Sequence, residues 1–523
     1  MYKKGWAALV SMVLVTGLVV TGCGGGAKTG GSSSTGKALV YAQGSDPRGL
    51  DPAFVDDGES AKIITQIYEG LVRFKPGSTE IQPLLATEWT VSPDGKEWTF
   101  KLRQGVKFHD GTPFNAHAVK FNIERQLPPN ANADMPYAEF TYDGVKKVDA
   151  VDDYTVKITL DKPSAAFLAN LAMPIAAPLV SPEAAKKYGD KLMENPVGTG
   201  PYKFVKWEKG QMIELAAFDE YWGEKAKTKN VVYKFTKENS VRASDLMTGS
   251  VDIMDGVDTN DVKTLEEKGM KLIKTPGMNI NYMGFYTSKA PFNNLELRKA
   301  IAMAINRKNL VDFLYQGNAQ LPNSVLPDFI PGYSKDAKYL DYNVEEAKKQ
   351  LAKAGYPNGF SFNAITYSNP RPYNPVNGEK LAAAIQADLA KIGVTMNIKS
   401  YPWKEYKEVL KNGEGDAYFY GWIGDNGDAD NFLMLLDTAQ IKGSLNSSKY
   451  SNPKLDQMLE EGRTTMDPAK RAQIYAQAQQ LINDDVPWVP ISHSVDMAAV
   501  RPNVKGFDLH PTGVHWLDIV TKE

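Results

Sequence analysis

Residues 85–125 read LATEWTVSPDGKEWTFKLRQGVKFHDGTPFNAHAVKFNIER. Within this stretch TEWTV and EWTFKLR flank SPDGK, whose Pro-Asp-Gly supplies the backbone freedom that a hairpin turn requires. In the second arm Trp98, Phe100 and Leu102 alternate onto one face, which is the spacing of a strand with one apolar side. The stretch therefore predicts a β-hairpin.

Segments on both sides of the hairpin carry strand or helix patterns. ALVYAQ (38–43) and YTVKITL (154–160) are strand-like, and apolar residues occupy alternate positions in the second. Apolar residues recur at helical spacing in SAKIITQIYEGLVRF (60–74) and in EKLAAAIQADLAKIGV (379–394), where we expect Gly393 to cap the helix. The uneven order of strands and helices predicts an α/β fold with mixed sheets, and we find no internal repeat in the sequence.

The length of the chain predicts more than one lobe. Roughly 485 residues follow the N-terminal segment, and 42% of the whole chain is hydrophobic while 23% is charged. A body of this size favours two or three lobes. Prolines interrupt the helix and strand patterns at TPGMN (275–279) and DDVPWVP (484–490), so these two segments are candidate boundaries.

The N-terminal segment predicts export and lipid attachment. Residues 1–22 read MYKKGWAALVSMVLVTGLVVTG, a basic start followed by an apolar run that is too short for a transmembrane helix and typical of a signal peptide. Cys23, the only cysteine, follows Val-Thr-Gly and resembles the lipidated cysteine of bacterial lipoproteins. The alternative is a signal peptide that ends near a free thiol. Residues 24–37 (GGGAKTGGSSSTGK) are expected to form a flexible tether. We therefore expect an extracytoplasmic protein, anchored by lipid to the outer face of the cell membrane or periplasmic.

Charge and cysteine content narrow the function classes. Removing residues 1–22 takes away two lysines and no acid, which changes the net charge from −2 to about −4. Neither a basic excess nor a Lys/Arg cluster is present, which argues against a nucleic-acid partner. No stretch after the signal peptide approaches 18 apolar residues, and one cysteine cannot form an internal disulfide. The body is therefore expected to be stable through its core alone.

The sequence lacks the motifs of common catalytic and metal sites. We find no G-x-S-x-G, P-loop or H-E-x-x-H pattern. The five histidines are scattered, and His109 and His117 lie eight residues apart around a turn, which is not a helical ligand spacing. With no cysteine beyond Cys23, a thiolate metal site is excluded. We therefore expect no enzyme activity, metal or cofactor, although a site assembled from distant residues stays open.

An acidic segment, GWIGDNGDADNF (421–432), is the strongest candidate for a binding site. It follows the strand-like DAYFYGWI (416–423). Counting an EF-hand loop from either Asp425 or Asp428 puts the wrong residues at the ligand positions, so calcium is disfavoured. Two readings remain open: a surface turn beside a core tryptophan, or a carboxylate that anchors an ammonium group with help from the face of Trp422.

Several long motifs resemble one family. The 85–125 stretch is similar to the signature of the peptide/nickel/opine class of extracytoplasmic solute-binding proteins (family 5), the receptors of ABC importers. The resemblance covers essentially the whole chain after the tether. It continues in NPVGTGPYKF (195–204), AFDEYWG (217–223), PFNNLELRKAIAMAINR (291–307) and NPRPYNPVNGEKLAAAIQADLAKIGV (369–394). Within the class, RPYNP followed by GWIGDNGD is most similar to the dipeptide-binding members.

The resemblance implies a ligand site and roles for its residues. Arg371 would pair with the C-terminal carboxylate of a dipeptide and Asp425 with its N-terminal ammonium. The resemblance also assigns Tyr373, Trp422 and Gly424 to the ligand site. Asp428 and Asp430 would only shape the turn. A zwitterion enclosed away from water needs a countercharge at each end, which agrees with these roles.

The resemblance also implies a two-lobed periplasmic-binding-protein fold of type II, with a two-segment hinge. Lobe I would comprise residues 38–277 plus 488–523, with a subdomain at about 50–195, and lobe II residues 278–487. The implied protein is a monomer that delivers peptide to an ABC permease. Departures from the dipeptide-binding members, namely the absence of internal disulfides and local differences at VNGEK (376–380) and at GWI, leave longer peptides or another small charged solute open. Separate alternatives are a carrier of a nickel complex or haem within the same class, and a peptide sensor, chaperone or peptide-acting enzyme.

Overall fold

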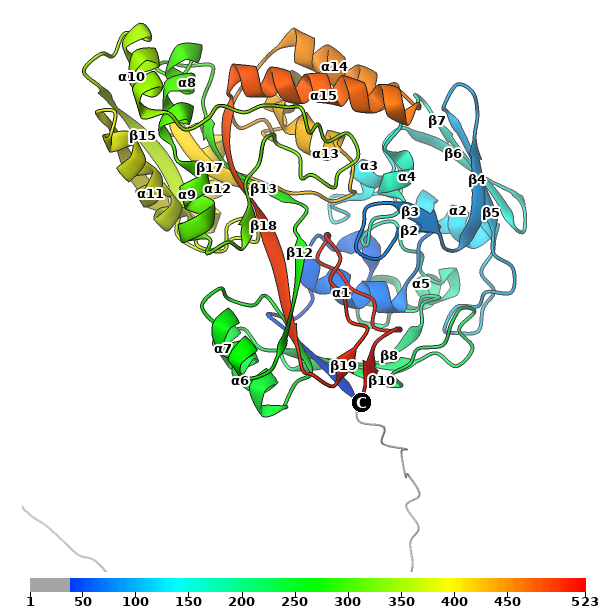
Figure 1. Cartoon of the computed structure of the whole chain (residues 1–523). Coiled ribbons are helices and arrows are strands. Elements are labelled where there is room, and N and C mark those ends of the chain that lie inside the picture. The colour runs from blue at the N-terminus through cyan, green and yellow to red at the C-terminus, as the bar shows by residue number, and fades with distance from the viewer. Residues whose placement is uncertain (1–37) are drawn as a thin grey trace, which may run out of the picture. The chain divides into compact units, whose positions relative to one another are not determined.

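The structure of the chain is a computed structural model that describes residues 38–523 (Figure 1). The predicted signal peptide (1–22), Cys23 and the tether through residue 37 lie outside the described residues. Among the helices of residues 38–523, none combines the length and the apolar character that crossing a bilayer requires.

The largest sheet contains twelve strands in the order β16-β15-β17-β13-β18-β11-β1-β10-β9-β8, with β12 and β14 pairing with β18 beside this path. It mixes parallel pairs, such as β15 with β16, and antiparallel pairs, such as β13 with β17, as the sequence predicts. The strands are β1 (Leu39–Gln43), β8 (Tyr202–Glu208), β9 (Met212–Ala217), β10 (Asn230–Phe235), β11 (Ile253–Asp255), β12 (Lys271–Pro276), β13 (Asn279–Phe285), β14 (Ala319–Gln320), β15 (Phe360–Tyr367), β16 (Val394–Tyr401), β17 (Ala417–Ile423) and β18 (Trp488–Val500).

The predicted hairpin at residues 92–96 is confirmed and belongs to a separate four-stranded sheet. That sheet has the order β4-β5-β7-β6. Ser92 N donates to Glu97 O at 2.9 Å, and Gly95 takes the left-handed backbone (φ +70°) that the turn needs. Two further pairs of short strands complete the β structure. These strands are β4 (Ala86–Val91), β5 (Glu97–Leu102), β6 (Val145–Asp152), β7 (Thr155–Leu160), β2 (Val72–Phe74), β3 (Ile81–Pro83), β19 (Val504–Lys505) and β20 (Thr521–Lys522).

The helical pattern predicted over 60–74 is wrong at its C-terminal end. Helix α1 ends at Ile67, Tyr68 takes extended backbone, and residues 72–74 form β2. Pairing of β2 with β3 outweighs the helical periodicity there, and Phe74 lies opposite Ile81. The helix predicted over 379–394 is confirmed as α11, which ends at Ala390, and Gly393 follows with φ +77°.

The helices and single turns pack against these sheets. The α-helices are α1 (Gly58–Ile67), α2 (Ala116–Glu124), α3 (Ala138–Thr141), α4 (Phe167–Asn170), α5 (Pro182–Tyr188), α6 (Asn239–Thr248), α7 (Val262–Glu267), α8 (Leu295–Ala304), α9 (Arg307–Asn309), α10 (Val344–Lys353), α11 (Gly378–Ala390), α12 (Trp403–Lys411), α13 (Asp430–Leu433), α14 (Pro453–Thr464) and α15 (Pro468–Asp485). Shorter turns are η1 (Pro52–Phe54), η2 (Gly189–Glu194), η3 (Leu310–Leu314, a π-turn), η4 (Met434–Leu436) and η5 (Thr438–Ile441).

Buried apolar side chains of residues 38–523 form four clusters. One contains only residues from Met278 to Ile491, and the β4–β7 sheet covers another that lies within 71–179. The other two combine residues before Ile273 with residues after Val495. Strand β18 contributes to all of these clusters except the one within 71–179, because its first half pairs with β13 and its second half with β11 and β12 (Figure 1).

Candidate functional site

Two neighbouring strands end at the same edge of the large sheet. Strands β15 and β17 run parallel, with Ala364 opposite Ala417. The RPYNP segment follows the carboxyl end of β15, and the acidic turn, defined as residues 424–430, follows the carboxyl end of β17. In open α/β sheets, ligands bind outside the carboxyl ends of parallel strands. The topology therefore brings the two segments that carry Arg371 and Asp425 to the edge where a ligand is expected.

A reciprocal backbone pair fixes the turn that carries Arg371. Arg371 N donates to Asn374 O at 3.0 Å, and Asn374 N donates to Arg371 O at 2.8 Å. The buried Asn374 amide then ties this turn to its surroundings: its Nδ2 donates to Tyr367 Oη at 3.0 Å, and its Oδ1 accepts from Tyr315 Oη at 3.0 Å. These contacts hold the RPYNP turn against the sheet.

The guanidinium of Arg371 lies over an aromatic ring. Its Cζ is 3.9 Å from the ring centroid of Trp403, which in turn stacks on Tyr420 with centroids 5.8 Å apart. Within residues 38–523 the side chain makes no ion pair, and its buried Nε lacks a hydrogen-bond partner. An arginine held by an indole face keeps its planar N–H fork in position for an anion.

Tyr373 lies beside this arginine with an unpartnered hydroxyl. A Cβ on Gly421 of β17 would come within 2.3 Å of the Tyr373 ring, so the glycine lets the tyrosine lie directly on the strand. The ring is buried, and within residues 38–523 its hydroxyl has no hydrogen-bond partner. The pair of Arg371 and Tyr373 thus presents donors without acceptors.

Asp425 is held by two donors from different parts of the chain. Tyr137 Oη donates to Asp425 Oδ1 at 2.8 Å, and Asn431 Nδ2 donates to Oδ2 at 3.3 Å. The Oδ1 of Asn431 accepts from Asp425 N at 3.1 Å and from Trp422 Nε1 at 3.0 Å. One asparagine therefore orients both the carboxylate and the neighbouring indole.

Burial raises the pKa of Asp425 to about 6, because the loss of hydration outweighs the hydrogen bonds from Tyr137 and Asn431 that lower the pKa. No cationic side chain of residues 38–523 pairs with this carboxylate. A partly desolvated carboxylate with neutral donors and no countercharge gains strongly from an ammonium group.

Gly424 joins the acidic turn to Met278, the residue directly before β13. Its N–H donates to Met278 O at 2.7 Å, and a Cβ here would lie 2.7 Å from Phe432 and 2.9 Å from Met278. Real Cβ contacts essentially never come this close, so only glycine fits without displacement. This close approach fixes the backbone immediately before Asp425.

The expectation that Asp428 and Asp430 only shape the turn is incomplete. Asp428 Oδ1 does accept from Asp430 N at 2.9 Å, which is a turn contact. Both carboxylates also pair with arginines of distant helices: Asp428 with Arg471 at 2.5 Å and 2.7 Å, and Asp430 with Arg463 at 3.0 Å and 3.1 Å. They are therefore already neutralised and lock the turn onto α14 and α15.

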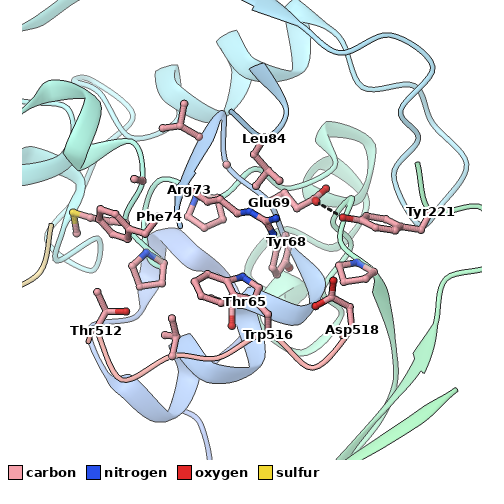
Figure 2. A pocket seen from close by; sticks show the side chains of 18 residues that line it. Thr65, Tyr68, Glu69, Arg73, Phe74, Leu84, Tyr221, Thr512, Trp516 and Asp518 are labelled. Atoms are coloured by element: carbon pink, nitrogen blue, oxygen red, sulfur yellow. Dashed lines mark hydrogen bonds between the residues drawn. The ribbon is translucent and has the colours of Figure 1, made fainter. Parts of the chain in front are cut away.

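Two cavities of residues 38–523 lie away from this edge of the sheet. A small one of about 50 Å³ is lined by Arg73, Glu69, Trp516 and other side chains, and Tyr221 Oη donates to Glu69 Oε1 at 2.7 Å within it (Figure 2). Peptide-sized ligands occupy sites of roughly 300–1,000 Å³, whereas one water needs roughly 10–15 Å³. The small cavity therefore has room for a few waters and none for a peptide.

The second cavity, of about 950 Å³, is large enough for a peptide. Volume alone would favour it as the ligand site. However, its two arginines are already paired, Arg48 with Asp56 and Arg125 with Asp51. It therefore lacks the opposed, unpaired charges that the edge of β15 and β17 provides, and we consider the latter the stronger site for a zwitterion.

The structure brings the predicted site residues to one edge and adds three that sequence reasoning missed. These are Trp403 under Arg371, and Tyr137 and Asn431 on Asp425. Asn431 falls inside the acidic segment and could have been proposed as a partner from its proximity. Nothing in the sequence connects Tyr137 to a residue 288 positions later.

Comparisons with known proteins agree with this architecture. The model of "Bacterial extracellular solute-binding proteins, family 5 Middle" matches residues 80–444. The chain is 37% identical to the haem-binding protein A of Haemophilus influenzae, covering 93% of this chain and 92% of the relative. It is 35% identical to the dipeptide-binding protein of Escherichia coli, covering 95% and 97%.

A solved structure shares the fold along almost the whole chain. The ABC transporter-associated periplasmic binding protein DppA of Helicobacter pylori, in complex with the peptide STSA, matches with a TM-score of 0.76 and 36% identity, over 93% of this chain and 98% of that one. The predicted fold class, a two-lobed α/β fold of the periplasmic-binding-protein type with mixed sheets, is confirmed.

Proposed function

Because this chain belongs to family 5 of the bacterial extracellular solute-binding proteins, we propose that it captures dipeptides or short peptides and delivers them to an ABC-transporter permease for import. Similar proteins are named for dipeptides, and one was solved with a bound tetrapeptide. The observation that carries the proposal is the pair of uncompensated charges, Arg371 and Asp425, at the common edge of β15 and β17.

The proposed site matches a zwitterion in charge. Arg371 offers a planar fork to the carboxylate and Asp425 an oriented acceptor to the ammonium. Tyr373, Trp422 and Gly424 line the space between them in this proposal, and water fills the side-chain pockets and tolerates variation.

The proposal also covers how the chain divides into lobes, how lipid anchors it, and that it does not act as an enzyme. Lobe I comprises residues 38–277 plus 488–523, lobe II residues 278–487, and the two hinge segments lie near 277 and 488. The hydrophobic clusters support this division to within a few residues, because one runs from Met278 to Ile491 and another combines residues up to Ile253 with residues from Ala498. Lipid on Cys23 holds a monomer outside the cell membrane, within reach of the permease. The protein binds its ligand and leaves it chemically unchanged.

Haem is the second candidate ligand, because a relative at 37% identity is named for haem binding. Peptide and haem require different binding sites. A peptide needs both uncompensated charges at the edge of β15 and β17, whereas haem needs a large apolar face. Purified protein should therefore carry either peptide or porphyrin, and absorbance near the porphyrin band separates them.

Mass spectrometry provides the test of function. Ligand is released from the natively purified protein, and a defined mixture of dipeptides is analysed before and after incubation with the protein. Enrichment of intact dipeptides on the protein supports a receptor. Cleavage products would instead indicate an enzyme, and bound porphyrin without peptide would favour the haem class.

A further inference from the structure

The carboxylate of Asp425 receives its strongest hydrogen bond from the other half of the chain. Tyr137 is the residue directly before α3, and its ring packs edge-on against Phe140 with centroids 6.2 Å apart. Its hydroxyl donates to Asp425 Oδ1 at 2.8 Å. A hydrogen bond to an ionised carboxylate is roughly twice as strong as one between neutral groups.

A second contact holds the same two elements together. Asn426, the next residue of the acidic turn, donates from Nδ2 to Asn170 Oδ1 at 2.7 Å, and this contact is buried. Asn170 Nδ2 in turn donates to Phe140 O of α3 at 3.1 Å. Tyr137, directly before α3, and Asn170 of α4 therefore contact two consecutive residues of the turn, and of these two residues only Tyr137 contacts the carboxylate.

Other charged groups near the turn are already satisfied. Asp428 pairs with Arg471 of α15, and Asp430 pairs with Arg463 of α14. The remaining donor on Asp425 is Asn431 of α13. Asp56, which precedes α1, acts on the Tyr137 hydroxyl, whose pKa is raised first by burial and then by the negative charges of Asp425 and Asp56. Tyr137 is thus a neutral donor throughout the physiological range of pH.

We propose that Tyr137 is a positioning residue for the ammonium anchor: its hydroxyl, supplied by the first half of the chain, keeps the Asp425 carboxylate charged and oriented for the amino group of the ligand. This inference rests on the proposed peptide-binding function. It follows that the anchor is complete only when α3 lies against the acidic turn, so that the site belongs to both halves of the chain.

The proposal predicts an effect that depends on pH. The hydrogen bond from Tyr137 opposes the rise that burial causes in the pKa of Asp425, which stands at about 6. Removing one such donor raises a carboxyl pKa by about one unit. An ammonium binds the ionised form, so with this shift Tyr137→Phe should weaken binding about eightfold at pH 5.5 and less than twofold at pH 7.5. If the Tyr137 contact only held the two halves of the chain together, its removal would weaken binding by the same factor at both pH values.

Calorimetry with the dipeptide Ala-Phe tests this on the full-length protein. Tyr137→Phe is compared with wild type at each pH, so that titration of the ligand's own amino group cancels. Asn170→Ala is the matched control, because it removes the neighbouring contact to Asn426 without touching Asp425. We expect a pH-dependent loss for Tyr137→Phe and a pH-independent one for Asn170→Ala. Equal losses at both pH values for Tyr137→Phe, or the same pH dependence in Asn170→Ala, would overturn the proposal.

A second measurement needs no ligand. The carboxyl ¹³C signal of Asp425, assigned by its loss in Asp425→Asn, is titrated in the unliganded protein. Tyr137→Phe should raise the midpoint by about one pH unit, and an unchanged midpoint contradicts the proposal. If the midpoint moves but Asp425→Asn binds Ala-Phe as wild type does, the peptide anchor fails while the role of Tyr137 on the carboxylate stands.

Discussion

Replacing Asp425 with asparagine should make the protein more stable at neutral pH. Burial raises the pKa of the Asp425 carboxyl to about 6, whereas the unfolded chain keeps a value near 3.9. The folded state therefore binds the proton more tightly, and this group lowers stability progressively as pH rises from about 4 to about 6. Above pH 6 the penalty is constant. A difference of two pKa units corresponds to about 3 kcal/mol at pH 7.5.

Asparagine removes this penalty but introduces a smaller cost. Its carbonyl can still accept from Tyr137, while its amide faces the Nδ2 of Asn431, which is also a donor. That amide of Asn431 cannot turn round, because its oxygen already accepts from Asp425 N and Trp422 Nε1. One lost hydrogen bond costs about 1 kcal/mol. The net gain at pH 7.5 should therefore be about 2 kcal/mol.

Urea unfolding followed by tryptophan fluorescence measures this gain. Wild type and Asp425→Asn are compared at pH 4 and pH 7.5, and Asp219→Asn is the control, because Asp219 is 82% exposed and makes only a loose pair with Lys229. The gain should appear at pH 7.5 and vanish at pH 4. If Asp425→Asn is as stable as wild type or less stable at pH 7.5, the reasoning is refuted. The ionised carboxylate would then stabilise the folded protein, and its burial would not be a stability cost that is retained for ligand binding.

Two further predictions concern other parts of the chain. Asp428→Ala should destabilise the fold by about 3–5 kcal/mol in the same unfolding assay, because it leaves the largely buried Arg471 without its countercharge. Asp219→Ala should change stability by less than about 0.5 kcal/mol. Arg471 also donates to Tyr475 Oη and Gly462 O, and a loss below about 1 kcal/mol for Asp428→Ala would show that these two acceptors satisfy the arginine alone. Cys23→Ser should release the protein from the membrane fraction without changing the unfolding midpoint of the body, and radiolabelled lipid that still enters this variant would disprove the predicted anchor.

Local chemistry made much of the fold predictable. The SPDGK turn and the alternating arm around Phe100 depend on neighbouring residues only, and both form as predicted. The error at residues 72–74 arose because a partner strand, β3, overrides helical periodicity. Pairing partners of this kind are tertiary information that a periodic pattern does not contain.

The candidate site, like the fold, could be predicted from the sequence only in part. The family resemblance singled out Arg371 and Asp425, and the parallel pairing of β15 and β17 brings their segments to one edge. Sequence reasoning could not assign Asp428 to Arg471, or Tyr137 to Asp425, because these contacts join residues 43 and 288 positions apart. What looked like three equivalent aspartates is one uncompensated carboxylate and two that are already paired.

The central claim is that a peptide binds with its ammonium on Asp425 and its carboxylate on Arg371. Calorimetry of wild type, Asp425→Ala, Arg371→Ala and a control, Arg48→Ala, with Ala-Phe and its capped forms tests this most directly. Arg48 lines the larger cavity and is 63% exposed. Breaking one side of a buried charge pair costs about 2–5 kcal/mol, which is about 30-fold to several-thousand-fold in affinity.

We expect N-acetylation of Ala-Phe to weaken binding to wild type and to Arg48→Ala by that factor, and to weaken binding to Asp425→Ala far less. C-terminal amidation should show the same pattern with Arg371→Ala. If acetylation penalises wild type and Asp425→Ala equally, the ammonium does not bind at Asp425, and the account of this site is wrong.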